Sequence, residues 1–162
     1  PQYFNKVCNY NEDTIGLLLA LNGILVVLFE MPLVTFLEKK QKIFPFIITG
    51  VIFLPVSFGI LIAGKGALPW AIMYTIAMTL AEMFTLPFMM NYALSRPPQE
   101  RQGQYSALYS ISFGIANIAA PSLGLGIAGH FGFDRMFYFF ILLGFITAGG
   151  FWLLNGGKVE ND

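Results

Sequence analysis

Five long apolar blocks, separated by short polar segments, dominate this chain. An α-helix rises about 1.5 Å per residue, so about 20 apolar residues are enough to cross a bilayer. Backbone that is exposed to lipid must satisfy its own hydrogen bonds, so we expect each block to be an α-helix. The pattern predicts an all-α transmembrane fold with five membrane-spanning helices, at residues 14–37, 43–63, 68–94, 104–129 and 136–154.

The connections between the blocks carry most of the charged residues. Because these connections are short, we expect successive helices to be antiparallel neighbours. No separate soluble region is visible, so residues 1–162 are predicted to form one transmembrane bundle. The four connecting segments are EKKQK (38–42), GKGA (64–67), SRPPQERQGQ (95–104) and HFGFDR (130–135).

Composition supports a membrane protein. Hydrophobic residues make up 56% of the chain and charged residues only 11%, with a mean hydropathy of +0.67. A soluble domain usually carries about 25% charged residues, because its surface must be solvated. The net charge is zero, so nothing indicates nucleic-acid binding. The single cysteine, Cys8, excludes an internal disulfide framework.

The basic residues predict an orientation in the membrane. Cytoplasmic loops of membrane proteins carry an excess of lysine and arginine. Alternating helices would place six of the nine basic residues on one face, so we expect that face and the C-terminus to be cytoplasmic in a multi-pass protein of the cell membrane. These six are Lys39, Lys40, Lys42, Arg96, Arg101 and Lys158, and the opposite face holds Lys6, Lys65 and Arg135.

One carboxylate, Glu82, lies midway along an apolar block that has no lysine, no arginine and no second carboxylate. An ionised side chain at the centre of a membrane helix costs roughly 2.5–3.5 kcal/mol on insertion scales. Thr75 and Thr79 lie on the same helical face, which should therefore point toward protein or a water-filled cavity. Two roles remain open for Glu82. It could couple transport to proton or substrate binding, or it could tether neighbouring helices through hydrogen bonds.

Other polar residues within the blocks are weaker candidates. Asn22 and Asn117 are mid-helix amides, which could line the same proton or substrate pathway or form hydrogen bonds between helices. Glu30 lies two turns before Glu38 and could extend toward the lysines that follow or cap a neighbouring helix. We therefore assign a gating or cytoplasmic-loop role to Glu30, Glu38, Lys39, Lys40 and Arg101.

The fourth block carries small residues at every fourth position, namely Ala116, Ala120, Gly124 and Ala128. Small residues at this spacing let helix backbones approach closely in a membrane. Pro121 removes a backbone donor and is expected to kink the helix. This face is predicted to pack against a neighbouring helix, and a flexible rocking helix is compatible with the same pattern.

The sequence offers no signature of an enzyme. It lacks a metal-ligand cluster, a nucleophilic triad and a phosphate-binding loop, and the glycines of GLGIAGHFG (124–132) follow no strand. We expect no enzymatic activity, no metal and no cofactor.

Two segments resemble a known family of transporters. Residues 79–132 resemble the tenth and eleventh helices of major facilitator superfamily transporters, especially the proton-coupled drug-efflux branch. The stretch ALNGILVVLFEMPLVTFLEKKQK (20–42) resembles the eighth helix and the loop after it, with Glu38 at the position of the loop acid. The matching or adjacent motif positions of the first segment are Glu82, Pro87, Pro97, Arg101, Gly103 and Tyr105.

This resemblance implies that the chain corresponds to helices eight to twelve of twelve, as part of the C-terminal six-helix bundle. It implies a missing N-terminal half as partner, together with the lipid bilayer, a small-molecule solute and protons. The implied function is that of a fragment of a secondary transporter, which moves a small organic solute or drug by proton-coupled alternating access. The alternative is a helical membrane scaffold or assembly partner that transports nothing.

Overall fold

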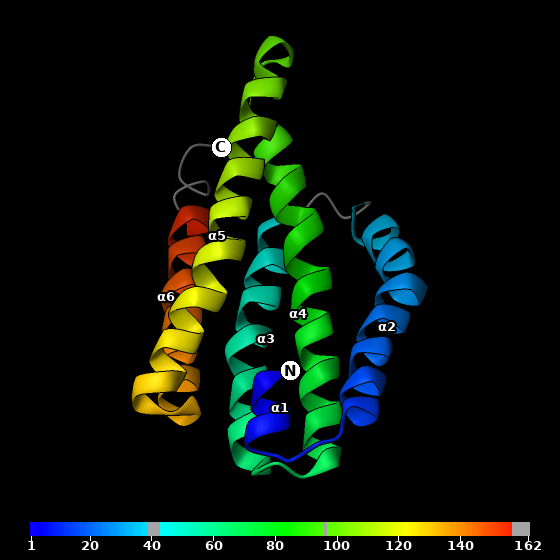
Figure 1. The fold of residues 1–162 in the computed structure, drawn as a ribbon. Helices are drawn as coiled ribbons and strands as arrows, with labels where there is room; N and C mark the ends of the chain where they lie inside the picture. The colour runs from blue at the N-terminus through cyan, green and yellow to red at the C-terminus, as the bar shows by residue number, and fades with distance from the viewer. Residues whose placement is uncertain (39–42, 96, 157–162) are drawn as a thin grey trace.

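The fold is that of a computed structural model, which describes residues 1–38, 43–95 and 97–156. Within these ranges the backbone is almost entirely helical (Figure 1). The five long helices are α2 (Glu12–Glu38), α3 (Ile43–Gly64), α4 (Leu68–Ser95), α5 (Gln102–Phe131) and α6 (Phe133–Gly156). Two short elements accompany them, the helix α1 (Gln2–Lys6) and the 3₁₀ turn η1 (Gln99–Arg101).

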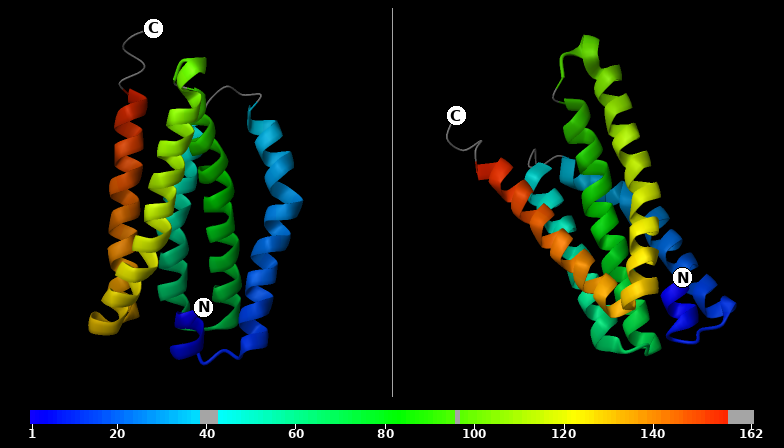
Figure 2. Two further views of the ribbon diagram at one scale, coloured as in Figure 1. Left: turned by 45° about the horizontal axis from the view of Figure 1, so that its top comes forward. Right: turned by 60° about the vertical axis from the view of Figure 1, so that its left-hand side comes forward.

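The long helices form one bundle with α3 and α4 at its centre (Figure 1). Helix α2 packs against α4 on one side, while α6 packs against α3 on the other. Helix α5 contacts both α4 and α6, and its connection to α4 projects beyond the ends of the other helices (Figure 2). The α3–α4 and α5–α6 connections lie together at the opposite end, next to α1.

The prediction of five membrane-spanning helices is confirmed. All five long helices have the length and hydropathy needed to cross a membrane, and each has at most two charged residues in its most apolar window. The connection predicted at residues 130–135 is wrong in detail, because α5 continues to Phe131 and α6 begins at Phe133. Gly132 alone joins them with a φ of 88°, a conformation that glycine adopts without steric cost.

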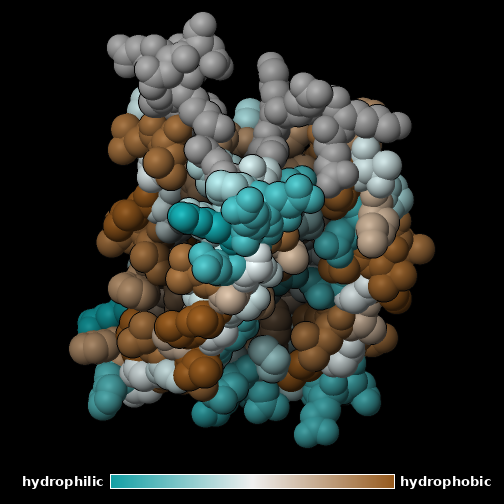
Figure 3. Space-filling model, turned by 90° about the horizontal axis from the view of Figure 1, so that it is seen from above, coloured by the Kyte–Doolittle hydropathy of each residue, from teal (hydrophilic) through white to brown (hydrophobic). Residues whose placement is uncertain are grey.

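The outer surface of the bundle is apolar along much of its length. Val27 on α2 is 78% exposed and Ile118 on α5 is 75% exposed, although both lie well inside their helices. Seen from the end that carries the α4–α5 connection, hydrophilic side chains gather near the centre and along the lower edge of the view, while apolar side chains cover much of the left and right flanks (Figure 3). Such a surface requires lipid or another apolar partner, because water would not solvate it.

Two apolar clusters hold the helices together, one toward each end of the bundle. The first surrounds Phe4, Leu18, Leu61, Ala71 and Phe137, and the second surrounds Leu37, Ile47, Val51, Phe88 and Ala148. Helix α4 contributes Ala71 to one cluster and Phe88 to the other. Glu82 lies between Ala71 and Phe88 along α4, so the polar side chains of α4 lie between the two apolar clusters.

Two glycines allow α3 to lie close to its neighbours. A Cβ added to Gly50 would lie 2.9 Å from the carbonyl oxygen of Ala81 on α4 and would also meet the Thr85 hydroxyl. A Cβ added to Gly144 on α6 would lie 3.0 Å from the Pro55 ring on α3. The centre of the bundle therefore depends on these two positions lacking side chains.

Candidate functional site

Glu82 lies at the midpoint of α4 and is half-buried. Thr75 and Thr79 precede it by seven and three residues, which places all three side chains on one face of the helix. Thr79 is 1% exposed and Thr75 is 7% exposed. Each threonine hydroxyl donates to the carbonyl oxygen four residues earlier, at 2.9 Å for Thr75 to Ala71 and 2.7 Å for Thr79 to Thr75. The polar face of α4 therefore points into the bundle.

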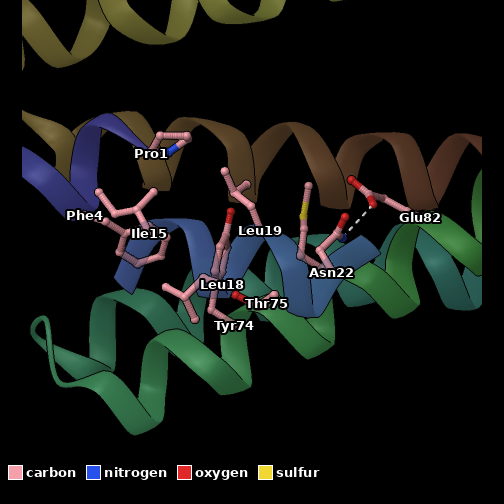
Figure 4. Close-up of a pocket in the computed structure, with 10 residues that line it drawn as sticks. Pro1, Phe4, Ile15, Leu18, Leu19, Asn22, Tyr74, Thr75 and Glu82 are labelled. Atoms are coloured by element: carbon pink, nitrogen blue, oxygen red, sulfur yellow. Dashed lines mark hydrogen bonds between the residues drawn. The ribbon is translucent and has the colours of Figure 1, made fainter. Parts of the chain in front are cut away.

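Asn22 of α2 completes this polar cluster. Its Nδ2 donates to Thr79 Oγ1 at 2.9 Å and to Glu82 Oε2 at 3.3 Å. The side chains of Asn22 and Glu82 point toward one another from the two helices (Figure 4). The Asn22 side-chain amide thus helps to fix the position of α2 against α4. The side-chain oxygen of Asn22 can still accept a further hydrogen bond.

The electrostatic setting of Glu82 is unusual for a carboxylate at this depth. Among residues 1–38, 43–95 and 97–156, no cationic side chain pairs with it, and the Asn22 amide supplies its one hydrogen bond. At 3.3 Å that bond is longer than the 2.7–2.9 Å typical of a charge-assisted one. An ionised carboxylate with so little compensation is costly away from water. A proton or a bound cation would relieve that cost.

A pocket of about 220 Å³ opens beside this cluster, between α1, α2 and α4. Asn22, Thr75 and Glu82 supply polar groups to its wall, while Phe4 and Leu18 form part of its apolar end (Figure 4). Tyr74 also lines the pocket and was missed by the sequence analysis. Its position next to Thr75 was the only signal in the sequence that could have indicated it.

A second cavity, of about 300 Å³, lies on another side of Glu82, between α3, α4 and α6. Its walls are almost wholly apolar, and Glu82 and two threonines, Thr85 and Thr147, are the polar residues that line it. Glu82 is therefore the residue that borders both cavities. The second cavity was not predicted, because the contact between α3 and α6 could not be inferred from the sequence of either helix alone.

Several predicted residues lie away from this cluster. Asn117 is exposed on α5, and its amide donates to the Phe113 carbonyl of its own helix at 2.9 Å. Glu30 is half-buried on α2, eight residues beyond Asn22, and lines neither cavity. Arg101 is exposed at the end of η1, and Glu38 is the last residue of α2. Lys39 and Lys40 lie outside the described residues.

The small-residue face of α5 divides into two parts. Gly124 is buried against α6, where an added Cβ would lie 3.2 Å from the Phe140 ring, and Ala128 is half-buried. Ala116 and Ala120 are exposed. Pro121 lies inside α5, which remains one helix from Gln102 to Phe131. Only the C-terminal part of the predicted face therefore packs within this chain.

An aromatic cluster closes the end of the bundle near α1, and nothing in the sequence analysis indicated it. The Tyr3 ring meets the Phe137 ring edge-on at 4.9 Å, and the Phe4 ring stacks on Tyr10 at 5.6 Å. The Tyr10 hydroxyl donates to the Gly66 carbonyl in the α3–α4 turn at 2.9 Å. Burial raises the pKa of Tyr3 to about 12, with a contribution from neighbouring Cys8, and burial also raises the pKa of the Cys8 thiol.

A bundle of membrane-length helices is the architecture of a multi-pass membrane protein, and a poorly compensated carboxylate at its centre marks a candidate functional site. The chain belongs to the Major Facilitator Superfamily, whose family model matches residues 1–160.

A curated relative is the Na(+), Li(+), K(+)/H(+) antiporter of Planococcus maritimus. It is 26% identical over 157 residues, which cover 93% of this chain and 36% of the relative. The chain thus spans about a third of the length of that relative. No solved structure matches the chain.

Proposed function

We propose that this chain is the C-terminal part of a secondary transporter that moves a small solute by proton-coupled alternating access. The observation that carries the proposal is the position of Glu82, which has a single long hydrogen bond and borders two cavities at the midpoint of α4. In this proposal the helices correspond to the eighth to twelfth of a twelve-helix carrier. An N-terminal half would then cover apolar faces such as that of α2.

The proposed mechanism rests on exchange at one carboxyl group. When Glu82 holds a proton it is neutral, and its cost in the membrane interior is small. When a cationic solute binds, the carboxylate is neutralised by that charge, and the displaced proton leaves to water. Because the Glu82 carboxylate can bind either a proton or the cationic solute but not both, movement of the solute is coupled to movement of protons in the opposite direction. Alternating access then exposes the occupied site to one side of the membrane at a time.

A second candidate cargo is an inorganic monovalent cation. The curated relative is named as an antiporter of Na(+), Li(+) and K(+) against H(+). The Glu82 carboxylate and the Thr79 hydroxyl supply oxygen atoms around the same Asn22 nitrogen, and hard cations prefer oxygen ligands. A single carboxylate also matches a single positive charge.

The competing role for Glu82 is a structural tether, as expected in a scaffold without transport activity. The Asn22–Glu82 hydrogen bond is compatible with this role. Glutamine keeps the shape of glutamate and can still accept from Asn22, but it cannot exchange a proton. Glu82→Gln therefore separates the two roles.

The experiment measures solute accumulation driven by a pH gradient in membrane vesicles that contain the transporter. We expect Glu82→Gln to abolish this accumulation and also to weaken solute exchange without a gradient, because the amide can neither release a proton nor neutralise a cationic solute. Glu12→Gln, at the exposed start of α2, serves as the matched control and should behave like the parent. Normal accumulation in the Glu82→Gln variant would leave Glu82 as a tether only.

A further inference from the structure

Glu30 is a second carboxylate within the long apolar part of α2, and the exchange proposed for Glu82 does not use it. Asn22 precedes it by eight residues, while Leu33 and Leu37 follow it by three and seven. Asn22 bonds to α4, Leu37 belongs to the second apolar cluster, and Leu33 packs against that cluster. Glu30 therefore lies at the edge of the face of α2 that meets α4, and its side chain is half-buried.

Glu30 lies inside the hydrocarbon layer of the membrane when α2 is centred in it. Helix α2 has 27 residues, so it is about 40 Å long and exceeds a hydrocarbon core of about 30 Å by roughly 5 Å at each end. Glu30 is eight residues, or about 12 Å, from the last residue of α2, which places it about 7 Å inside that core. In the part of the chain that the structure describes, its carboxylate forms neither a hydrogen bond nor an ion pair. A carboxylate at this depth is costly when ionised and typically belongs to a pathway for ions or protons.

No other acidic or basic side chain accompanies Glu30 in the described helix segments of its half of the bundle. We call the end that carries the α4–α5 connection the inner end, because the basic residues predict that it faces the cytoplasm. Between the level of Glu82 and the inner end, Glu30 is the one residue of the Asp, Glu, Lys, Arg or His type in these segments. The segments are residues 23–37, 43–51, 83–95, 102–115 and 144–156.

Glu82 has different surroundings on its two sides. Toward the outer end, where α1 lies, the pocket of about 220 Å³ places polar groups beside it. Toward the inner end, the second apolar cluster separates it from the α4–α5 connection. A proton that Glu82 releases inward must therefore cross an apolar region in which Glu30 is the carboxylate able to accept it.

We propose that Glu30 is the inner proton site of the carrier, which takes the proton from Glu82 and passes it to the cytoplasmic water. The proposal rests on the exchange function given above and assigns the inward part of its proton route. When the inner ends of the helices separate and admit water, the Glu82 carboxylic acid gives up its proton and the Glu30 carboxylate accepts it. Glu30 then releases the proton to water, so both groups end as carboxylates and Glu82 is free to bind the solute.

The spacing of the two groups determines how the proton moves between them. Asn22 marks the level of Glu82 on α2, and Glu30 lies eight residues further along that helix, or about 12 Å along its axis. The transfer therefore runs through the water that enters on opening, because the two carboxyl groups are too far apart for a direct hydrogen bond.

The test measures proton flux driven by a gradient of cargo cation, with the transporter in proteoliposomes that contain the pH dye pyranine. NaCl, KCl and tetramethylammonium chloride serve as cargo salts in separate runs. We expect Glu30→Gln to lower the maximal rate at least about tenfold, as removal of a proton-transferring group does, and to leave the half-saturating cargo concentration within about twofold. The cargo binds at Glu82, which this variant retains.

Two further measurements separate a proton site from a structural role. Azide, added as its N-methylglucamine salt, is the base of a small weak acid that carries protons, and it should restore most of the lost rate in Glu30→Gln without changing the parent. Glu30→Asp keeps an acid and should retain more of the maximal rate than Glu30→Gln. Asp13→Asn, at the exposed start of α2, is the matched control and should behave like the parent with and without azide.

Two outcomes would overturn the inner proton site. One is a maximal rate in Glu30→Gln equal to that of the parent. The other is a lost rate that azide does not restore and that Glu30→Asp shares, which would show that Glu30 only positions the helices. The Glu82→Gln assay reports separately on the exchange function. If Glu82→Gln is uncoupled while Glu30→Gln behaves like the parent, the exchange function stands without the inner site, and if both behave like the parent, the exchange function fails as well.

Discussion

Asn22 on α2 donates its side-chain amide to the carboxylate of Glu82 on α4, across 3.3 Å and 60 positions of sequence. The same amide nitrogen donates to Thr79 Oγ1 at 2.9 Å. Helix α2 buries few side chains within this chain, with Leu18 and Leu37 as the two buried hydrophobic residues between Glu12 and Glu38. The polar contact is therefore a substantial part of what fixes α2 against α4.

Removal of the Asn22 amide should weaken this contact. Asn22→Leu has a similar volume but leaves Glu82 without its hydrogen bond, and a lost hydrogen bond with a half-buried partner costs about 1–3 kcal/mol. We expect a lower unfolding temperature in detergent. Asn117→Leu is the control, because the Asn117 amide bonds only within its own exposed helix. Equal shifts for the two variants would contradict the interhelical role.

The close approach of α3 to α4 gives a second prediction. Gly50→Ala would place a methyl group 2.9 Å from the Ala81 carbonyl oxygen, and overpacking of this kind costs about 1–3 kcal/mol. Gly59→Ala lies on the same helix with nothing within 4 Å of the added atom, so it should gain up to about 1 kcal/mol from helix propensity. Thermal unfolding of the two variants should therefore shift in opposite directions. A neutral Gly50→Ala would mean that α3 and α4 are further apart.

The helices could be predicted from the sequence because their signal is local. A run of about 20 apolar residues needs no knowledge of its neighbours to be identified as a span. The contact at Gly50 depends instead on which helix lies opposite, and a single sequence does not encode that directly. The small-residue pattern on α5 therefore led to the prediction of a packing face there, although Ala116 and Ala120 are exposed. The close helix contacts occur instead at Gly50 and Gly144.

In the candidate site too, features set by one helix could be predicted, whereas contacts between helices could not. The face that holds Thr75, Thr79 and Glu82 follows from helical periodicity, which one helix determines by itself. Asn22 and Asn117 are equivalent by sequence, since both are amides within apolar helices. Only packing separates them, because Asn22 faces α4 and Asn117 is exposed on α5.

The contact between α5 and α6 can be tested at Gly124. Gly124→Leu would extend a side chain from a point already 3.2 Å from the Phe140 ring, so we expect a loss of about 1–3 kcal/mol in stability. Gly114→Leu provides the control on the same helix, since an added Cβ there meets nothing within 4 Å. If the two variants unfold at the same temperature in detergent, Gly124 does not face α6.

The proposed orientation can be tested with single cysteines in a Cys8→Ser background. The positive-inside bias leads us to expect that cysteines placed at Gln41 and Gln102 react with a membrane-impermeant maleimide only from the cytoplasm. Gln41 lies outside the described residues, while Gln102 begins α5 and is exposed. Native Cys8 lies near the opposite end of the bundle and should react only from outside. Labelling of Gln102→Cys from outside would reverse the proposed topology.

The reactivity of Cys8 gives a prediction with a defined pH dependence. Burial raises the pKa of the Cys8 thiol, and a hydrogen bond from Tyr3 acts in the opposite direction by stabilising the thiolate. Because the thiolate is the reactive form, alkylation by iodoacetamide should reach half its maximal rate above the ordinary thiol value of about 8.5. Tyr3→Phe keeps the ring but removes the donor, so the pKa should rise further and alkylation at a given pH should slow. Tyr138→Phe, exposed on α6, should leave the profile unchanged. A midpoint at or below that of a free thiol, or equal profiles for Tyr3→Phe and the parent, would show that Cys8 is solvated and that α1 does not cover it.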